Sequence, residues 1–294
     1  MSEPVASIVF TTYNQPAWLE KTLLGFAAQD RRDFEVLVAD DGSGADTAAL
    51  IESLRSRLPF ALRHVWHEDR GFRKSRILNA AIAASRADYL IFTDGDCIPR
   101  RDFVSMHLRL RRPGRYLSGG YLKLPMELSR RISGDDIASN RCFELAWLRA
   151  HGLPTAARNV KLLAQGASAA LLDRIVTASP TWNGHNASGW KRDLVAANGF
   201  DERMGYGGQD RELGERLGNA GVRGIRVRHR AIALHLDHAR GYRNGEALRR
   251  NFAIRARTRI AKATWTEHGI VKGPAHGGAS PAGLALGEGG QRAT

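Results

Sequence analysis

Cysteine is scarce in the 294-residue chain, and no apolar run is long enough to span a bilayer. The two cysteines, Cys97 and Cys142, lie far apart, which excludes a disulfide framework or a cysteine zinc site and favours a reducing compartment. The first residues also lack the basic and apolar regions of a signal peptide. We therefore expect a cytoplasmic protein, either soluble or held peripherally on the inner face of a membrane.

Acidic residues are outnumbered, with 30 Asp and Glu against 44 Lys and Arg and a formal charge of +14. This excess favours an anionic partner, which charge alone leaves open among nucleic acid, an anionic membrane surface and a phosphorylated substrate. An unspecialised basic surface is the alternative. Because no basic motif is interleaved with aromatic residues, we expect no nucleic-acid partner.

Several nucleotide-binding and catalytic motifs are also absent. No G-x-G-x-x-G follows the first expected strand, which argues against a dinucleotide fold, and the glycine spacing at residues 71–75 does not match a P-loop. No Ser-His-Asp or Cys-His set is evident, so the chain offers no obvious covalent nucleophile.

What the first half does contain is an alternation of strand and helix patterns. Asn14 is expected to cap the first helix, with Pro16 in its first turn. This alternation predicts an α/β fold with a parallel, doubly wound sheet. The expected strands are residues 6–12, 34–39, 62–66 and the run ending at Asp94, and the later helices of this half are residues 47–58 and 73–84.

The second half is less regular. A short helix is expected to end at residues 194–197, with Gly199 at its C′ position. Residues 273–294 are rich in Gly and Ala with little apolar bulk, so we expect them to be disordered. The remaining patterns predict strands at residues 115–122 and 222–235 and helices at residues 132–150, 210–219 and 247–265.

Two carboxylates end the fourth strand. Residues 89–96 read Tyr-Leu-Ile-Phe-Thr-Asp-Gly-Asp, so Asp94 and Asp96 follow a buried run with only Gly95 between them. Ligands of open α/β sheets collect beyond the carboxyl ends of the strands. Two acids at that edge are suited to a hard divalent cation shared with a phosphate ligand. The motif therefore points to metal-assisted chemistry on a phosphate-bearing donor.

Other polar groups are expected at the same edge. Asp40 and Asp41 end the second strand, where an acid can accept from a uracil imide or ribose hydroxyls, or simply form a turn. Arg73 opens the third helix in a basic cluster, which suits either an anionic ligand or solvent.

Two further motifs lie in the second half. Glycines precede Asp210 at a helix start and allow a ligand to approach the backbone, although an acid there can be an ordinary N-cap. His235 and His238 follow the last strand, where an imidazole can complete a cation site or be structural.

Taken in order, these motifs resemble those of family 2-type glycosyltransferases of the GT-A fold, over roughly residues 5–240. Each motif is weak alone, but the ordered set is specific. The matching segments are Thr-Thr-Tyr-Asn at 11–14, Asp-Asp-Gly-Ser at 40–43, Arg73 with Leu78-Asn79, and Thr-Asp-Gly-Asp at 93–96. Segments 198–202, 206–210 and 235–238 are similar to the acceptor-side half of galactosyltransferase-type members.

The resemblance implies roles for particular residues. Asp210 would be the general base; members commonly have Glu-Asp where this chain has Gln209-Asp210, which leaves Asp210 as the single candidate. The donor would contact Thr11, Tyr13, Asp40, Asp41, Arg73 and Asp94. A Mn²⁺ or Mg²⁺ ion would be held by Asp96, Asp94, His238 and His235, and the acceptor by Asn186, Tyr206, Gly207, Gly208 and Gln209.

The resemblance also implies an organisation and a reaction. Residues 1–120 would form the nucleotide-sugar half and 121–240 the acceptor and catalytic half of one GT-A domain, followed by a basic helical segment at 241–272 and the tail. The reaction would be inverting transfer of a hexose from a nucleotide-sugar, with UDP as the expected nucleotide, to a hydroxyl of a glycan or glycolipid in bacterial cell wall, surface polysaccharide or lipopolysaccharide synthesis. A sugar nucleotidyltransferase and a non-enzymatic nucleic-acid binder are the alternatives.

The segment at residues 240–262 carries eight basic residues and the single acid Glu246. Leu248, Phe252 and Ile260 recur on one helical face, which predicts that this stripe packs the helix onto the domain. The further hypothesis is that its basic side rests on anionic lipid.

Overall fold

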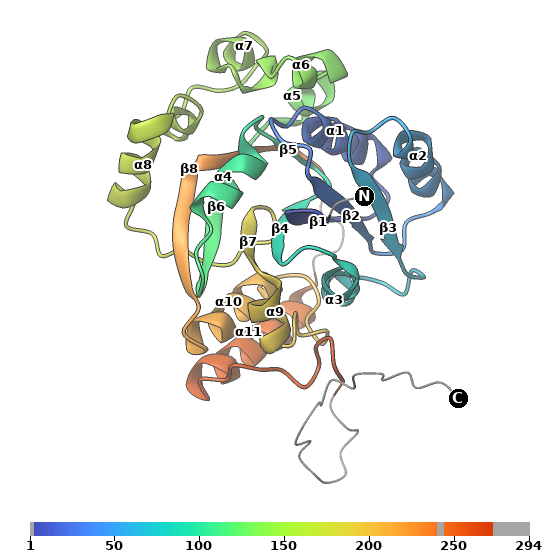
Figure 1. Ribbon diagram of the computed structural model, residues 1–294, viewed down its shortest axis with the longest axis vertical. Coiled ribbons are helices and arrows are strands. Elements are labelled where there is room, and N and C mark those ends of the chain that lie inside the picture. Colours follow the sequence, from blue (N-terminus) through green and yellow to red (C-terminus); the bar gives the residue numbers. More distant parts are fainter. Residues whose placement is uncertain (1–2, 240–243, 273–294) are drawn as a thin grey trace, which may run out of the picture.

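The computed structural model describes residues 3–239 and 244–272, and its centre is one eight-stranded sheet (Figure 1). The strand order is β3-β2-β1-β4-β7-β6-β8-β5. The first four neighbours and the β6–β8 pair are parallel, whereas β7 and β5 are antiparallel to their partners. The strands are β1 (Ala6–Thr12), β2 (Phe34–Asp40), β3 (Ala61–Trp66), β4 (Tyr89–Asp94), β5 (Cys97–Pro99), β6 (Arg115–Lys123), β7 (Ala187–Trp190) and β8 (Arg223–His235). The predicted α/β, mostly parallel sheet is confirmed.

Helices cover both faces of the sheet because successive strand residues point to opposite sides. In β1, Ile8 and Phe10 pack with helices α1, α2 and α4, whereas Val9 packs with α3, α9 and α10. These helices are α1 (Pro16–Ala27), α2 (Ala45–Arg55), α3 (Lys74–Ala84), α4 (Phe103–Leu110), α9 (Lys191–Ala196) and α10 (Gln209–Asn219).

A smaller apolar cluster joins β5 and the ends of β6 and β8 to the short helices that follow β6. The single helix expected at residues 132–150 is wrong, because the chain there is broken into short pieces. Ser133 begins a new helix with a capping box, and Asn140 takes a left-handed φ of 62° that no helix interior tolerates. The pieces are α5 (Met126–Arg131), α6 (Gly134–Ala138), η1 (Arg141–Phe143), α7 (Leu145–Ala150), η2 (Ala157–Leu162) and α8 (Gly166–Ile175).

Two expected caps are also corrected. Asn14 has a left-handed φ of 48°, and Gln15 is the N-cap of α1; the Asn14 side chain instead accepts from the backbone N–H of Gly44. At the end of α9 the C′ position belongs to Asn198, with Gly199 one residue further. The sequence patterns gave no sign of β5, β7, α4 or α8, which are short or lack a clear period. The expected disordered tail, 273–294, lies outside the described residues.

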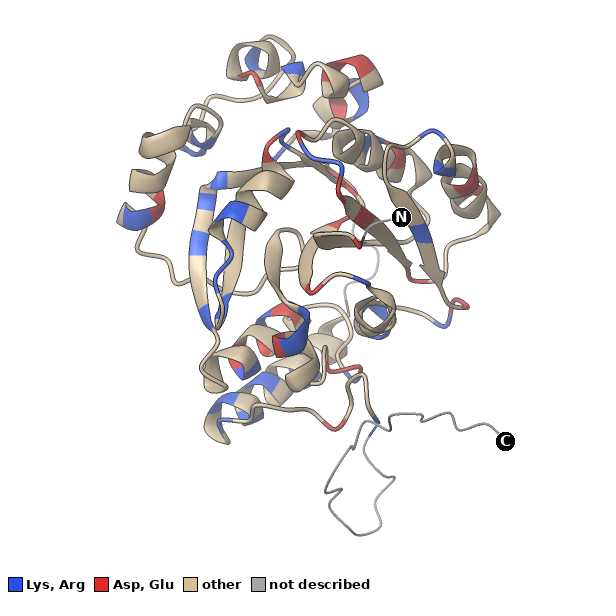
Figure 2. Ribbon diagram, in the orientation of Figure 1, with Lys and Arg blue, Asp and Glu red and all other residues tan. Residues whose placement is uncertain are grey.

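The last helix, α11 (Gly245–Ile260), packs on α10 in a way that reverses the expected orientation. Its buried residues are Asn251, Ile254 and Thr258, whereas Phe252 is 60 % exposed and Ile260 is 84 % exposed. Glu215 of α10 pairs with Arg255 at 2.6 Å, so a polar face docks this helix. The prediction of an apolar stripe against the domain is therefore wrong for Phe252 and Ile260, whereas Leu248 is half-buried beside Gly207. Basic residues mark the outer helix (Figure 2). Among the described residues no helix is long and apolar enough to cross a membrane.

Candidate active site

Asp94 ends β4 at the carboxyl edge of the sheet, as predicted. Its carboxylate accepts from the Thr11 hydroxyl at 3.0 Å and from Lys74 Nζ at 2.6 Å. Burial opposes ionisation of Asp94, but the charge and hydrogen bond of Lys74 outweigh burial and hold its pKa below the usual range. Burial likewise lowers the pKa of Lys74, while Asp94, Asp210 and Asp96 reverse this effect and raise it. The edge therefore holds an ionised lysine among three carboxylates.

Asp96 faces two imidazoles. His238 Nε2 lies 3.1 Å from its Oδ2, and His235 Nε2 lies 3.9 Å from its Oδ1. The Nδ1 atoms of His235 and His238 each lie 2.8 Å from a backbone carbonyl oxygen, of Leu236 and Ala239. Because a carbonyl only accepts, both Nδ1 atoms carry protons, which leaves both Nε2 atoms to face the carboxylate. Burial and the nearby Asp94 raise the pKa of Asp96.

This cluster fits a divalent cation. Ligand atoms of Asp94, Asp96, Cys97 and His235 all lie within 4.8 Å of one another. Oxygen and imidazole ligands suit Mn²⁺ or Mg²⁺, and a Nδ1–H held by a carbonyl orients the Nε2 lone pair. Cys97 does not fit such an ion, because its thiol is soft and burial keeps its pKa well above the ordinary value. Asp94, Asp96 and His235 are therefore the members of the cluster that suit such a cation, and His238 lies beside them, 3.1 Å from Asp96.

The other donor-side residues line the ends of β1, β2 and α3. Asp41 accepts from His67 Nε2 at 2.8 Å and from the Arg73 backbone at 2.9 Å, and burial raises its pKa despite these partners. The Tyr13 hydroxyl donates to Asp69 at 2.8 Å, and its ring is 47 % exposed. The Arg73 guanidinium donates to the Glu68 carbonyl. These groups share the edge with Asp94.

The side chains of Asp40 and Asn186 are buried and are not exposed at that edge of the sheet. Asp40 is fully buried and accepts from the Ser43 backbone and from His64. Asn186 is also fully buried, and its amide donates to the carbonyls of Gly120 and Ala231. Both side chains therefore stabilise, through these hydrogen bonds, the backbone next to the site.

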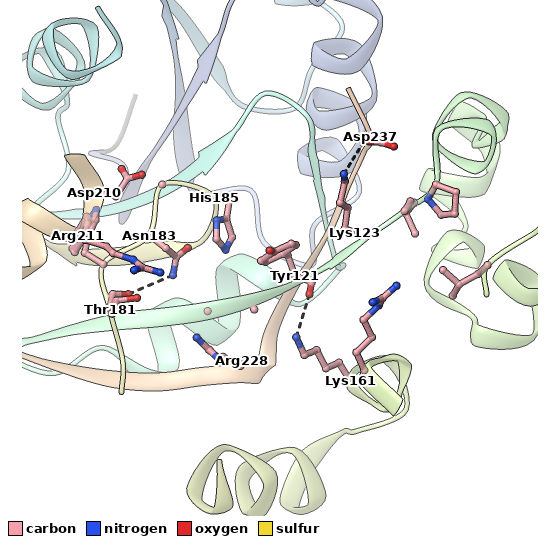
Figure 3. A pocket seen from close by; sticks show the side chains of 18 of the residues that line it. Tyr121, Lys123, Lys161, Thr181, Asn183, His185, Asp210, Arg211, Arg228 and Asp237 are labelled. Carbon is pink, nitrogen blue, oxygen red and sulfur yellow. Dashed lines mark hydrogen bonds and ion pairs between the residues drawn. The ribbon is translucent and has the colours of Figure 1, made fainter. Parts of the chain in front are cut away.

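A cavity of about 850 Å³ opens beside the acidic cluster, between β6, β8, α10 and the segment at residues 153–161 (Figure 3). Asp210 and His185 line it together with Tyr121, whose ring lies 4.3 Å from that of His185. The volume falls in the range of small-molecule sites. The candidate cation cluster lies next to this cavity, since the ring of Tyr121 also lies 5.6 Å from the ring of His235.

Asp210 enters this cavity from the first turn of α10. Gly208, with a φ of 89°, precedes the helix in a conformation that other residues rarely adopt. The Oδ1 atom of Asp210 is buried and has no hydrogen-bond partner within the described ranges 3–239 and 244–272. Burial raises the pKa of Asp210, with Asp94 adding to the rise and Lys74 opposing it. A carboxylate with one free oxygen and a raised pKa is suited to accept a proton.

The glycine-rich turn before Asp210 is held from α11. Asn251 Nδ2 lies within hydrogen-bond distance of the carbonyls of Gly205, Tyr206 and Gly207, at 3.0, 3.1 and 2.9 Å. Gln209 is buried and accepts from the Gly207 backbone at 2.9 Å, so it supports its own turn. The Tyr206 ring contacts Phe72 edge-on. Of the predicted acceptor residues, Gly208 lines the cavity.

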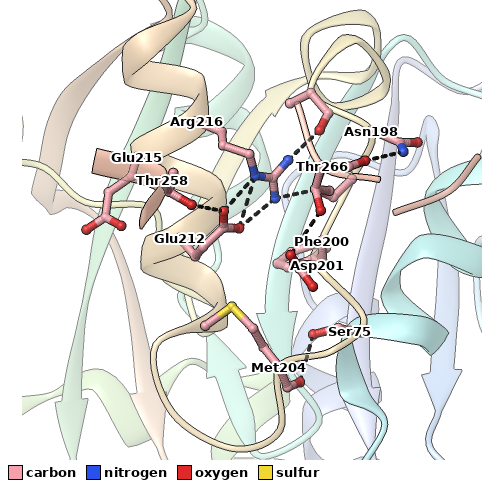
Figure 4. A network of polar contacts seen from close by, with 12 residues as sticks. Ser75, Asn198, Phe200, Asp201, Met204, Glu212, Glu215, Arg216, Thr258 and Thr266 are labelled. Carbon is pink, nitrogen blue, oxygen red and sulfur yellow. Dashed lines mark hydrogen bonds and ion pairs between the residues drawn. The ribbon is translucent and has the colours of Figure 1, made fainter. Parts of the chain in front are cut away.

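A buried ion pair fixes α10 behind the site (Figure 4). The Arg216 guanidinium donates to Glu212 at 2.7 Å and to the carbonyls of Ala197 and Gly199. Thr258 of α11 donates to the same Glu212 carboxylate at 2.8 Å. The network joins α9, α10 and α11, so the start of α10 has a rigid support.

Sequence reasoning missed four residues of the site. Lys74 stood in a basic cluster from which Arg73 was chosen, and only the helix register shows that Lys74 reaches Asp94. His185 and Gly184 lie in a loop without periodicity. Asn251 falls in a helix whose pattern suggested a different buried face.

Comparison with known proteins agrees with this architecture. Residues 7–118 match the family model described as Glycosyl transferase family 2. The chain is 34 % identical over 105 residues to the uncharacterized glycosyltransferase YfnE of Bacillus subtilis, covering 35 % of this chain and 26 % of the relative. It is 27 % identical over 235 residues to a hyaluronan synthase of Pasteurella multocida, covering 72 % of this chain and 22 % of the synthase. The chain thus spans about a quarter of the length of these relatives.

Two solved structures share the fold. The mannosyltransferase PcManGT of Pyrobaculum calidifontis, in complex with GDP-Man and Mn²⁺, superposes with a TM-score of 0.54 at 20 % identity, covering 89 % of this chain and 63 % of that one. TarS of S. aureus in complex with UDP superposes with a TM-score of 0.56 at 17 % sequence identity, covering 89 % of this chain and 67 % of that chain. Residues 7–118 thus match the family 2 glycosyl transferase model, and the described chain has the GT-A fold, as the resemblance in its motifs implied.

Proposed function

We propose that the protein is an inverting, metal-dependent glycosyltransferase that moves a sugar from a nucleotide-sugar to a hydroxyl of a glycan or glycolipid. The observation that carries this proposal is proximity: the Asp94–Asp96–His235 cluster lies next to the cavity that Asp210 lines, because the ring of Tyr121 in the cavity wall is 5.6 Å from the ring of His235, and Asp210 keeps one oxygen without a partner among the described residues. A leaving diphosphate needs the first group and an attacking hydroxyl needs the second.

The cation, Mn²⁺ or Mg²⁺, would be held by Asp96 with Asp94, His235 and His238. When bound, it would neutralise charge on the departing diphosphate. Lys74 adds a protein cation at the same place, 2.6 Å from Asp94. The neighbour PcManGT was solved with Mn²⁺, which supports this class of ion.

The nucleotide would lie over the ends of β1 and β2. Asp41 is a suitable acceptor for a uracil imide, and the exposed Tyr13 ring with Thr11 and Arg73 would complete the donor contacts. We propose a UDP-sugar, in line with the UDP seen in TarS; the GDP-Man of PcManGT is the competing choice.

In the proposed reaction the acceptor hydroxyl enters from the cavity. Its oxygen attacks the anomeric carbon as the bond from that carbon to the diphosphate oxygen breaks, and Asp210 receives the hydroxyl proton. A single displacement of this kind inverts the anomeric configuration. The cavity wall would position the acceptor, and Gly208 would let it approach the backbone.

We further propose that α11 rests on an anionic membrane surface. Its outward side exposes Phe252 and Ile260, with Arg249 and Arg259 close to them on the helix surface. Apolar groups between arginines fit a lipid interface. This arrangement would suit a lipid-linked acceptor on the cytoplasmic side in bacterial surface polysaccharide, lipopolysaccharide or cell wall synthesis, and the polysaccharide synthases among the relatives support that setting.

The deciding experiment is a panel of nucleotide-sugars tested for thermal stabilisation with and without Mn²⁺, followed by product analysis. We expect one UDP-sugar to raise the melting temperature only with Mn²⁺ present, and a nucleoside diphosphate to be released with an acceptor. Release of pyrophosphate would instead establish the nucleotidyltransferase alternative, and salt-dependent retention of DNA or RNA without donor binding would favour the nucleic-acid binder.

A further inference from the structure

The wall of the 850 Å³ cavity is strongly basic. Five cationic side chains line it, against the two carboxylates Asp210 and Asp237, which leaves an excess of three positive charges. Asp237 is paired with Lys123 at 2.9 Å. The cationic residues are Lys123, Arg158, Lys161, Arg211 and Arg228.

Four of these cations have no carboxylate partner in the part of the chain that the structure describes. Arg158, Lys161, Arg211 and Arg228 form no ion pair there, and the Lys161 ammonium contacts Tyr121, at 3.4 Å from its carbonyl oxygen and 6.0 Å from its ring centroid. Two other arginines of β8 have partners, since Arg230 pairs with Asp173 at 2.8 Å and Arg226 donates to the Ala178 carbonyl. Four cations without a carboxylate partner therefore line one cavity.

Arg228 lines the cavity from a β-bulge in β8. The β6–β8 register shifts between Gly119 and Gly120, whose partners are Val227 and Ile232, so the β8 residues between those two bulge from the ladder. A side chain at residue 120 would meet the Arg228 carbonyl at 2.2 Å, and glycine there allows the bulge. In Figure 3 Arg228 and Lys161 lie on the lower side of the view and Asp210 on the upper left.

Gathering these cations has an electrostatic cost. Burial lowers the pKa of Lys161, and the charges of Arg228 and Arg158 lower it further. Like charges on one wall repel each other unless an anion lies between them. A neutral glycan would leave that repulsion in place, whereas a phosphate or carboxylate would remove it and form charge-assisted hydrogen bonds.

We infer that the acceptor is an anionic glycan or glycolipid, bearing a phosphate or a carboxylate that Arg228, Lys161 and Arg158 bind while its accepting hydroxyl lies at Asp210. The inference rests on the proposed function, because it assigns the cavity to the acceptor. It places the specificity for charge in β8 and η2, away from the metal cluster.

The test uses two matched pairs of probes whose binding to the full chain is measured by ligand-observed NMR. One pair is a tetrasaccharide of alternating glucuronic acid and N-acetylglucosamine and its carboxyl-reduced form; the other is methyl glucoside 6-phosphate and methyl glucoside. We expect at least one anionic probe to bind about 10-fold more tightly than its neutral partner, and the pair that responds identifies carboxylate or phosphate. Arg228→Gln and Lys161→Gln should each remove most of that preference, as loss of a charge-assisted bond does.

Arg57→Gln is the matched control, since Arg57 is an exposed arginine beyond α2. It should leave the preference intact. Equal binding of both members in both pairs, or an equal loss in Arg57→Gln, would overturn the inference. Binding of a UDP-sugar with Mn²⁺ is measured in the same variants: it should be unchanged in all three, and its absence from the unaltered protein would contradict the proposed function while leaving the anion preference readable.

Discussion

His235 and His238 stack against each other with ring centroids 5.7 Å apart, and both turn Nε2 toward Asp96. Neutral imidazoles would present two lone pairs to a carboxylate, an arrangement that a shared cation stabilises. At the scale of single residues, this is the strongest indication of where an ion binds.

Replacing Asp96 by Ala should therefore abolish Mn²⁺-dependent binding of the nucleotide-sugar. The fold should be retained, because burial already disfavours the charged form of Asp96 and its pKa is raised. Isothermal titration calorimetry with Mn²⁺ and thermal unfolding measure the two effects. Asp46→Ala, an exposed acid on α2, is the control. Unchanged metal-dependent binding in Asp96→Ala would rule out Asp96 as a ligand.

Asp210→Asn should keep donor affinity and lower kcat by at least ~100-fold, the scale of general base catalysis. In the unaltered protein only the ionised form of Asp210 accepts a proton, and its pKa lies above the ordinary value of 3.8. As the pH falls through that raised pKa, kcat should fall with it. The kcat–pH profile of the variant should lose this acid limb; a collapse of donor affinity would instead make Asp210 a binding residue.

Gly184→Ala should also lower kcat, because the added methyl would lie 2.9 and 3.0 Å from the two Asp210 carboxylate oxygens and would force the carboxylate to move. We expect a loss of about 10-fold or more, since small displacements of a catalytic group are costly. Donor affinity, measured by calorimetry, should not change. Gly218→Ala on α10, the helix that contains Asp210, meets no atom within 4 Å and should retain full activity; an equal loss in both variants would contradict the geometry.

The sequence was informative at residues where chemistry and strand ends coincide. Asp94 and Asp96 were predictable because two acids at the end of a buried strand have few structural uses, whereas Asp210 was implied by the family resemblance; all three lie at the edge or in the cavity. The sequence did not distinguish Asp40 and Asn186, whose side chains are fully buried, from these site residues. A sequence pattern indicates the side of the sheet on which a side chain lies, but it does not show whether a loop covers that side chain.

At the scale of elements, α11 shows why helical periodicity can mislead. Leu248, Phe252 and Ile260 form an apolar stripe, yet the buried contacts are Asn251 with the glycine-rich turn and Thr258 with Glu212. Hydrogen bonds to those specific groups decided the orientation, and no single-sequence pattern records them. Strands β1, β2 and β4 were predictable because their long apolar runs require burial on both faces.

The exposed stripe predicts membrane binding. Full-length protein should co-sediment with vesicles of phosphatidylglycerol and not of phosphatidylcholine at low ionic strength, because each Lys or Arg near an anionic surface contributes about 1 kcal/mol. The double variant Phe252→Ser/Ile260→Ser should bind more weakly. Leu171→Ser/Ile175→Ser removes similarly exposed residues from α8 and should bind as the parent does. Equal, negligible binding to both lipids would remove the membrane proposal.

At the scale of the whole molecule, one sheet runs through both predicted halves. Residue 120, the expected boundary, falls inside β6, while β5 from the first half pairs with β8 from the second. We expect a single calorimetric unfolding transition with equal van't Hoff and calorimetric enthalpies. A fragment of residues 1–120 should not fold, as judged by near-UV circular dichroism, because β5 and β6 lose their partners. Two separate transitions would show that the halves are independent.

Asn251 connects α11 directly to the glycine-rich turn that precedes Asp210, through its hydrogen bonds to the carbonyls of that turn. The same helix presents Phe252 outward and holds the turn that carries Asp210. If lipid binding orders α11, the turn becomes better fixed, and the two equilibria are coupled. Thermodynamic reciprocity then requires that acceptor binding at Asp210 strengthen attachment to the membrane by the same factor by which the membrane strengthens acceptor binding. An enzyme with this coupling would stay bound to the membrane surface while acceptor is present and would dissociate from the membrane once the acceptor is consumed.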